Sequence, residues 1–149
     1  MSALHDWSAG QLLAAYRERS LSPVEVMRSV IAQVERWEPR LCATYLYRPE
    51  QALAQARASE QRWLAGTPAG PLDGVPCTIK ENIATAGDPV PLGTAAVALA
   101  PAATHAPPAA RMREAHAIMF AKTTMPDYGM LSSGLSSFHP LARNPWDLS

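Results

Sequence analysis

The chain has 149 residues, of which 48% are hydrophobic and 17% charged, and its 13 basic and 13 acidic residues give a formal net charge of zero. This length and composition are typical of one globular domain, or part of one, with a buried core. Balanced charge without a basic stripe argues against nucleic acid as a partner. Two cysteines without a CxxC pair do not make a disulfide framework, so we expect a cytoplasmic protein.

The sequence offers little support for a leader, a membrane span or a bound cofactor. The first ten residues, MSALHDWSAG, lack the basic and apolar regions of a signal peptide, and no apolar run is long enough to cross a bilayer. Neither a phosphate-loop motif nor H-E-x-x-H occurs. The histidines are scattered and do not predict a zinc site: His5, His105, His116 and His139. We therefore expect no membrane partner, no metal and no cofactor.

Two helices are predicted at the start of the chain. The first lies in SAGQLLAAYRERS, where a serine is a suitable N-cap. The second is predicted over 23–38, because Ser22 and Glu25 form an S-x-x-E capping box and Pro23 suits the first helical position. We expect Pro39 to mark its end.

The rest of the chain alternates between strands and helices. The further predicted elements are a strand over 41–47, a helix over 49–66, a strand over 75–81, a helix in PAARMREA and a strand in AIMFAKT. Residues 84–108 predict an ordered loop with one short helical turn in GTAAVALA. The last 25 residues are rich in turn formers and predict a loop laid over a sheet. This alternation predicts the α/β class.

Lysine is rare in this chain, because 11 of its 13 basic residues are arginine and the only lysines are Lys80 and Lys122. At the end of an apolar strand, Lys80 could pack its stem while its ammonium reaches water. Alternatively it is a general base, which requires a neutral amine and therefore burial away from carboxylates; arginine cannot replace it. Its apolar neighbours favour burial, and Glu81 should point to the opposite face. For Lys122 we prefer a structural role as a strand-end lysine or a hydrogen-bond donor to nearby loops.

Three ordered segments resemble the amidase signature family. GPLDGVPCTIKENIATAG is similar to the lysine segment of the family, usually G-P-L-x-G-[IV]-P-x-x-[IV]-K-[DE]-N-[IV]. AKTTMPDYG is similar to G-K-T-N-M-P-E-[FY], and ARNPWDLS to R-N-P-[WY]-D. The opening SPVEVMRSVIAQVERWEPRLCATY also resembles the first helix and strand of the family. His116 and Ala121 depart from the pattern, which usually has glycine at both positions.

The resemblance implies the N-terminal part of the amidase signature fold, truncated, with a mixed central sheet flanked by helices. Residues 1–149 would then contain a helical lead-in with one strand over 1–69 and the catalytic-lysine region over 70–122. A loop over 123–149 would lead to the Gly/Ser-rich signature of the family, which we expect after Ser149.

The same resemblance implies amide hydrolysis through a Ser–cis-Ser–Lys triad, with Lys80 as the base and no cofactor. Both serines are expected outside this chain, so we expect the chain alone to be inactive. Gly129 and Met130, with Asp127 and Tyr128 before them, would line an acyl-binding wall, although an ordered polar loop explains them equally well. We interpret the nearby serines as loop hydroxyls: Ser132, Ser133, Ser136 and Ser137.

Three functional hypotheses stay open. The resemblance implies a small-molecule amide as the substrate of the complete enzyme. A close variant is the glutamine-hydrolysing component of the amidotransferase that releases ammonia from glutamine. The third is a non-catalytic interaction module, because an unfinished sheet with uncovered apolar surface would favour self-association or a complementing C-terminal segment.

Overall fold

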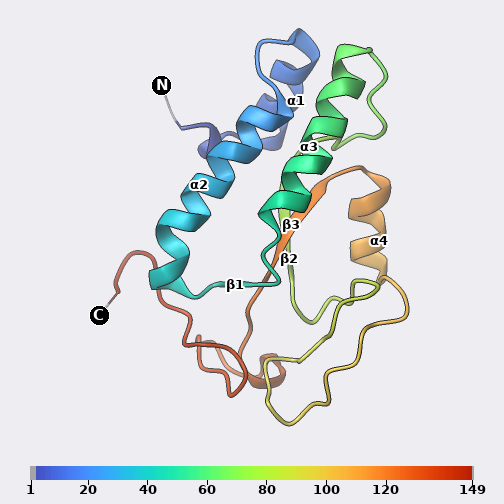
Figure 1. The fold of residues 1–149 in the computed structure, drawn as a ribbon. Coiled ribbons are helices and arrows are strands. Elements are labelled where there is room, and N and C mark those ends of the chain that lie inside the picture. The colour runs from blue at the N-terminus through green and yellow to red at the C-terminus, as the bar shows by residue number, and fades with distance from the viewer. Residues whose placement is uncertain (1–2, 149) are drawn as a thin grey trace. The chain divides into compact units, whose positions relative to one another are not determined.

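A computed structural model describes residues 3–148 and confirms the predicted order of helices and strands (Figure 1). Two short 3-10 turns, η1 and η2, are added to that order. In chain order the elements are η1 (Leu4–Asp6), α1 (Ala9–Glu18), α2 (Pro23–Leu41), β1 (Thr44–Tyr45), α3 (Pro49–Leu64), β2 (Pro76–Lys80), α4 (Pro107–Glu114), β3 (Ile118–Thr123) and η2 (Asp127–Gly129).

Both N-terminal helices begin at the predicted capping residues. The Ser8 hydroxyl accepts a hydrogen bond from the N–H of Gln11, and the Gln11 side chain accepts the N–H of Ser8 in return. At α2, the N–H of Glu25 donates to Ser22 Oγ at 3.2 Å and the Ser22 N–H donates to the Glu25 carboxylate at 2.9 Å. These reciprocal bonds satisfy N–H groups that have no partner within the helix.

The predicted end of α2 is wrong by three residues, because the helix continues through Pro39 to Leu41. Proline lacks the N–H that would bond to the preceding turn, so it removes one hydrogen bond from the ladder. Only two helical residues follow it, and the next N–H, of Cys42, again bonds to the carbonyl of Glu38 at 3.0 Å. The helix ends as Cys42 adopts a left-handed conformation with φ of 50°.

The strand predicted over 41–47 is shorter than expected, because β1 contains only Thr44–Tyr45. The Glu38 carboxylate accepts the first N–H of the strand at 2.8 Å, which removes that group from any ladder. On both sides of β1 the backbone takes positive φ values, 50° at Cys42 and 52° at Leu46, which extended strands do not allow.

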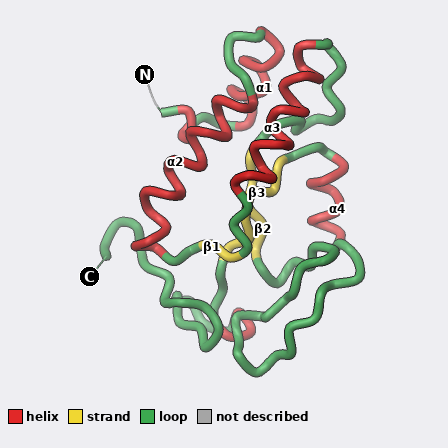
Figure 2. The backbone as a smooth tube through the Cα atoms, in the orientation of Figure 1, coloured by secondary structure: helices red, strands yellow, loops and turns green. Residues whose placement is uncertain are grey.

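The predicted helical turn in GTAAVALA is also wrong, because the long connection from β2 to α4 contains turns but no helix (Figure 2). Backbone hydrogen bonds order it. The N–H of Gly87 donates to Ala102 O and the N–H of Ala102 donates to Asp88 O, both at 2.9 Å. The N–H of Ala106 donates to the carbonyl of Ala84 at 2.9 Å just before α4 begins.

The three strands form one mixed sheet in the order β1–β3–β2. β1 and β3 are antiparallel, with Thr44 opposite Thr123 and Tyr45 opposite Lys122. β2 and β3 run in the same direction, since Val75 O accepts the N–H of Ile118 at one end and Thr123 O accepts the N–H of Glu81 at the other. The α/β class is therefore confirmed, and β2 is an outer strand of this sheet.

The chain forms two compact units. The first contains the residues up to Arg36, Arg48–Cys77 and Arg111–Phe120, and the second contains Trp37–Tyr47, Thr78–Ala110 and the residues from Ala121 on. In the first unit, α1, α2 and α3 pack together around Leu12, Tyr16 and Val26, with Trp63 of α3 beside them (Figure 1). Among residues 3–148, none of the helices combines the length and apolar character needed to cross a membrane.

Candidate functional site

Lys80 is the last residue of β2, and its side chain is exposed. Our expectation that it is buried is wrong for this chain. The reason lies in the alternation of the strand: Val75 and Ile79 are each 8% exposed and lie on one face, while Thr78 and Lys80 lie on the other. The apolar neighbours that favoured burial in the sequence therefore cover the wrong side of the strand.

Gly129 lies next to the ammonium of Lys80. A Cβ atom placed on Gly129 would be 3.9 Å from Lys80 Nζ and 3.1 Å from Cε of Met125. Within residues 3–148, Lys80 Nζ has neither a hydrogen bond nor an ion pair. Met130, the second predicted binding residue, follows directly and is 80% exposed. The structure therefore brings Gly129 to Lys80 and leaves the Met130 side chain at the surface.

The segment that carries Gly129 is held by hydrogen bonds to two other loops. The Asp127 carboxylate accepts the hydroxyl of Ser137 at 2.5 Å and its N–H at 2.9 Å. The hydrogen bond from the Ser137 hydroxyl, with a further one from Thr94, holds the pKa of Asp127 below its ordinary value. The N–H of Tyr128 donates to the carbonyl of Leu92 at 2.8 Å. Asp127 and Tyr128 thus fix the backbone that leads to Gly129.

The serines of the same region take part in local hydrogen bonds, as we expected for loop hydroxyls. Ser133 Oγ accepts the N–H of Leu135 at 3.3 Å. The Ser136 hydroxyl donates to the carbonyl of Gly93. Its oxygen also accepts the N–H of His139 at 2.8 Å, so Ser136 joins two loops.

Lys122, in β3, is only 3% exposed. Its ammonium donates to the carbonyl of Ile83 at 2.9 Å and to Thr85 Oγ1 at 3.1 Å. The Thr85 hydroxyl in turn donates to the carboxylate of Asp88 at 2.6 Å. The predicted role of Lys122 as a hydrogen-bond donor to nearby loops is confirmed.

A buried acid–base pair lies behind Lys80. Glu81 is fully buried, and Nε2 of the buried His139 lies 3.5 Å from its Oε2 atom. Burial raises the pKa of Glu81, and the opposing effects of His139, the N–H of Gly93 and Lys122 do not cancel it. The sequence treatment of His139 as one of four scattered histidines missed this pair, because nothing in the spacing of residues 81 and 139 joins them.

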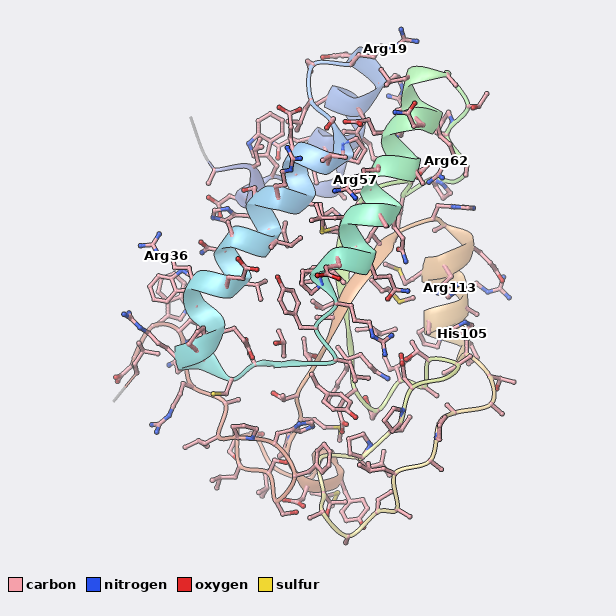
Figure 3. All side chains as sticks on the ribbon, in the orientation of Figure 1. Arg19, Arg36, Arg57, Arg62, His105 and Arg113 are labelled. Atoms are coloured by element: carbon pink, nitrogen blue, oxygen red, sulfur yellow. The ribbon has the colours of Figure 1, made fainter. Side chains whose placement is uncertain are left out.

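The turn before β2 is fixed in the first unit by a buried carboxylate. Arg62, which projects from α3, donates two hydrogen bonds to Asp73, Nε to Oδ2 at 2.8 Å and a terminal nitrogen to Oδ1 at 2.6 Å (Figure 3). The N–H of Ala69 donates to the same carboxylate at 2.9 Å, and Trp63 Nε1 donates to the Asp73 carbonyl at 3.1 Å. Burial raises the pKa of Asp73, but these hydrogen bonds with Arg62 and Ala69 lower it by more, so it lies below 3.8.

The first glycine of the GPLDG turn allows a close backbone approach. A Cβ on Gly70 would lie 2.6 Å from the carbonyl oxygen of Ala115, closer than van der Waals contact permits. This approach lets the N–H of Leu72 reach Ala115 O at 2.9 Å and the N–H of Gly74 reach His116 O at 3.2 Å. The start of β2 is therefore fixed to the loop that enters β3.

In the described residues 3–148, no group of three or more His, Cys, Asp or Glu side chains is arranged to hold a metal ion. Both cysteines, Cys42 and Cys77, are free thiols, and burial raises the pKa of Cys77 to about 11. A thiol that keeps its proton is a poor nucleophile. The titratable group that is both exposed and placed at the end of a sheet strand is the amine of Lys80.

Comparison with known proteins gives a consistent result. Residues 25–149 match the family model described as Amidase. The A-type subunit of glutamyl-tRNA(Gln) amidotransferase from Chloroflexus aurantiacus is 32% identical over 147 residues, which is 99% of this chain and 30% of that protein. The protein of the same name from Nitratidesulfovibrio vulgaris is 36% identical over 148 residues, again 99% of this chain and 30% of that protein. The chain thus spans about 30% of the length of these curated relatives.

Solved structures share the fold over a similar portion. A bacterial aryl acylamidase of the amidase signature enzymes is 29% identical with a TM-score of 0.83, over 99% of this chain and 31% of that one. The peptide amidase of Stenotrophomonas maltophilia has a TM-score of 0.80 at 24% identity, over 96% of this chain and 31% of that one, which is evidence of the fold alone.

Proposed function

The chain belongs to the amidase family, and from this premise we propose that Lys80 is the base of an amide-cleaving centre. We propose that residues 1–149 are the N-terminal segment of an amidase domain, with the lead-in, lysine region and loop assigned above from the sequence. The substrate class is small carboxamides, whose carbon–nitrogen bond is not a peptide bond of a protein chain. The serines of the triad are assigned to residues of the complete enzyme that follow this segment.

In this proposal Lys80 works as a neutral amine. It accepts a proton from a bridging serine, which in turn takes the proton of a nucleophilic serine as that serine attacks the amide carbonyl. The acyl-enzyme that forms is then hydrolysed, or its acyl group passes to an acceptor amine. The chemistry follows the logic of a serine activated by a neighbouring base, with lysine in place of histidine.

The observation that carries this assignment is the contrast between the two lysines. Lys122 already donates to Ile83 and Thr85 in a buried position, so its ammonium is held in the charged form as part of the fold. Lys80 is exposed at the end of β2, next to Gly129, and is available to a reacting group. A base that must lose its proton also needs protection from water, so we propose that the remaining part of the enzyme covers Lys80.

We further propose that Gly129 and Met130 line the acyl-binding wall. The lack of a side chain on Gly129 leaves space beside Lys80 Nζ, where a substrate acyl group could approach the base. The exposed Met130 side chain is apolar and flexible, which suits contact with varied acyl groups.

Two measurements test the assignment. The 149-residue chain alone should not hydrolyse p-nitroacetanilide or react with a fluorophosphonate probe, and labelling of any of its serines would contradict the proposal. In the complete enzyme, Lys80→Ala should abolish amide hydrolysis with an unchanged circular dichroism spectrum. Lys122→Ala should mainly lower stability, and an equal activity loss with unchanged folding in both variants would defeat the choice of Lys80.

A glutamine-hydrolysing amidotransferase is a second candidate, favoured by relatives up to 36% identical that are named as amidotransferase components. The two candidates differ in substrate and in partner proteins. Ammonia release from L-glutamine by the complete enzyme, with no release of nitroaniline from p-nitroacetanilide, would support the amidotransferase. The opposite result would support a hydrolase of small amides.

A non-catalytic interaction module is the third candidate, favoured by exposed apolar side chains in the second unit. Tyr128, Leu131, Leu135 and Trp146 are each more than half exposed, and β2 is an outer strand. Self-association, or binding of a complementing C-terminal segment, would cover such surface. Size-exclusion chromatography of the chain tests this, since a cooperative monomer that binds no hydrophobic dye would contradict it. The free thiols of Cys42 and Cys77 suit the cytoplasm, which we propose as the location.

A further inference from the structure

The residue directly after the proposed base is fully buried and fixed on the opposite side of the chain from the base. Glu81 has no exposed surface, and its N–H donates to the carbonyl of Thr123 at 3.0 Å. The N–H of Ile83 donates to the carbonyl of Lys80 at 3.0 Å, which closes a turn after β2. The Glu81 carboxylate is therefore kept in the interior while the Lys80 ammonium is exposed.

His139 is the imidazole that faces this carboxylate. Its Nε2 atom lies 3.5 Å from Glu81 Oε2, and its side chain is 4% exposed. The His139 ring packs edge-on against Tyr45 and Phe138, with centroid distances of 5.1 and 4.9 Å. A buried carboxylate and a buried imidazole are each costly without an opposite charge, so the two groups stabilise one another when the imidazole carries a proton.

Other charged groups lie around the pair, and none of them reproduces its geometry. Lys122 is buried in β3 and attracts the Glu81 carboxylate, while its ammonium donates to Ile83 and Thr85. Asp88 accepts the hydroxyl of Thr85 and so is linked to Lys122 through it. His139 differs from these groups because it comes from the loop that also reaches the segment beside Lys80.

The connection from His139 to Gly129 consists of short contacts. The His139 N–H donates to Ser136 Oγ at 2.8 Å, and the Ser136 hydroxyl donates to the carbonyl of Gly93. A Cβ on Gly93 would lie 2.3 Å from the carbonyl oxygen of Pro126, so these backbones touch. That same oxygen accepts the N–H of Gly129 at 2.9 Å.

From this arrangement we infer that Glu81 and His139 are positioning residues for Lys80. The pair fixes the backbone of the base at the end of β2 and, through the loops at residues 93 and 136, sets the position of Gly129 beside the ammonium. It also keeps the nearest carboxylate in sequence on the opposite face, where it does not contact the amine. This inference rests on the proposed function of Lys80 as the base.

The test uses Glu81→Gln, which conserves the volume of the side chain and removes the charge. In the complete enzyme, kcat for p-nitroacetanilide or L-glutamine, whichever it hydrolyses, should fall about tenfold or more, with KM changed less than about threefold, because a misplaced base slows the chemical step. Glu18→Gln, which makes the same change at an exposed position of α1, should leave both constants unchanged. A kcat of Glu81→Gln within twofold of the unchanged enzyme would overturn the inference.

A second pair of variants separates positioning from general packing. In His139→Gln the side-chain amide keeps a donor near the Nε2 position, whereas His139→Leu has a similar size and no donor. We expect His139→Gln to restore most of the kcat that His139→Leu loses, and equal losses in the two would contradict the inference. Failure of the proposed function gives a different result, since Lys80→Ala would then remain active.

A readout that needs no substrate uses the 149-residue chain itself. The chain has only two lysines, so lysine labelled with carbon-13 gives two side-chain resonances by NMR. The Lys80 resonance and the Gly129 amide resonance should move in Glu81→Gln and His139→Leu, and return towards their original positions in His139→Gln. Resonances that stay unchanged in all three variants would overturn the inference.

Discussion

The two units of the chain are stabilised in different ways. Most of the buried apolar side chains lie in the first unit: Leu12, Tyr16, Val24, Val26, Met27, Ile31, Val75, Ile118 and Phe120. The second unit instead buries polar and charged side chains: Glu81, Thr85, Asp88, Thr94, Lys122 and His139. Many of its large apolar residues are exposed, among them Leu99, Tyr128, Met130, Leu131, Leu135 and Trp146.

This difference indicates a division of labour along the chain. Burial of apolar side chains is the main source of stability in a folded domain, so the first unit should supply most of the free energy of unfolding. The second unit depends on hydrogen bonds and buried charges, which contribute less but fix geometry. Lys80 and Gly129, the residues assigned to chemistry, both lie in the second unit.

The largest effect should come from a cavity in the first unit. Met27 is completely buried, and Met27→Ala should lower the free energy of unfolding by about 2–5 kcal/mol, measured by urea denaturation. Leu135→Ala, at a residue 57% exposed in the second unit, should change it by less than about 0.5 kcal/mol. Similar losses in the two variants would contradict the proposed difference between the units.

Loss of the buried Asp73 charge should be the next largest effect. Asp73→Asn leaves the Arg62 guanidinium facing a neutral amide and should cost about 3 kcal/mol at neutral pH. The pKa of Asp73 is lower in the folded state than its ordinary 3.8, so its contribution is complete above about 3.8 and is lost as pH falls through the folded value. The stability difference between the two proteins should therefore shrink below about pH 4, and a difference independent of pH would argue against the assignment.

Glu81 should show the opposite dependence on pH. Burial raises its pKa above the ordinary 4.5, so the folded state favours the protonated carboxyl. Its contribution is favourable at low pH and is lost as pH rises from about 4.5 through the folded pKa. The stability of the unchanged chain relative to Glu81→Gln should therefore fall over this range, measured by thermal unfolding at a series of pH values. A relative stability that rises over this range would contradict the raised pKa.

The smallest effect concerns the end of α4 in the first unit. His116 adopts φ of 60°, and the N–H groups of His116 and Ala117 close the helix by bonding to Arg113 and Met112. Glycine takes this conformation without strain, so His116→Gly should raise the free energy of unfolding by about 1 kcal/mol. His116→Ala is the matched control, since it removes the side chain without relieving the backbone. A lower melting temperature for His116→Gly than for His116→Ala would contradict this explanation.

Local signals in the sequence were sufficient for much of the fold. The capping residues Ser8 and Ser22 placed two helix starts, and Pro49 placed the start of α3. The apolar runs before Lys80 and Lys122 placed β2 and β3. Boundaries that depend on side chains elsewhere were missed: the Glu38 carboxylate takes an N–H of β1 and shortens that strand.

The site was predictable as a set of motifs but not as an environment. Lys80 and Gly129 were named from segments far apart in sequence, and the structure places them together. The exposure of Lys80 and the pairing of Glu81 with His139 were not predictable, because both depend on how separate loops pack. A strand pattern gives the faces of β2, but it does not say which face the rest of the chain covers.

The central claim is that Lys80 acts by losing its proton. Lys80→Arg keeps a positive charge and a long side chain at the end of β2, but arginine does not deprotonate in proteins. In the complete enzyme the account predicts that kcat for amide hydrolysis falls at least about a hundredfold, with the fold unchanged. A Lys80→Arg enzyme that keeps a kcat within threefold of the original would contradict the assignment of Lys80 as the base.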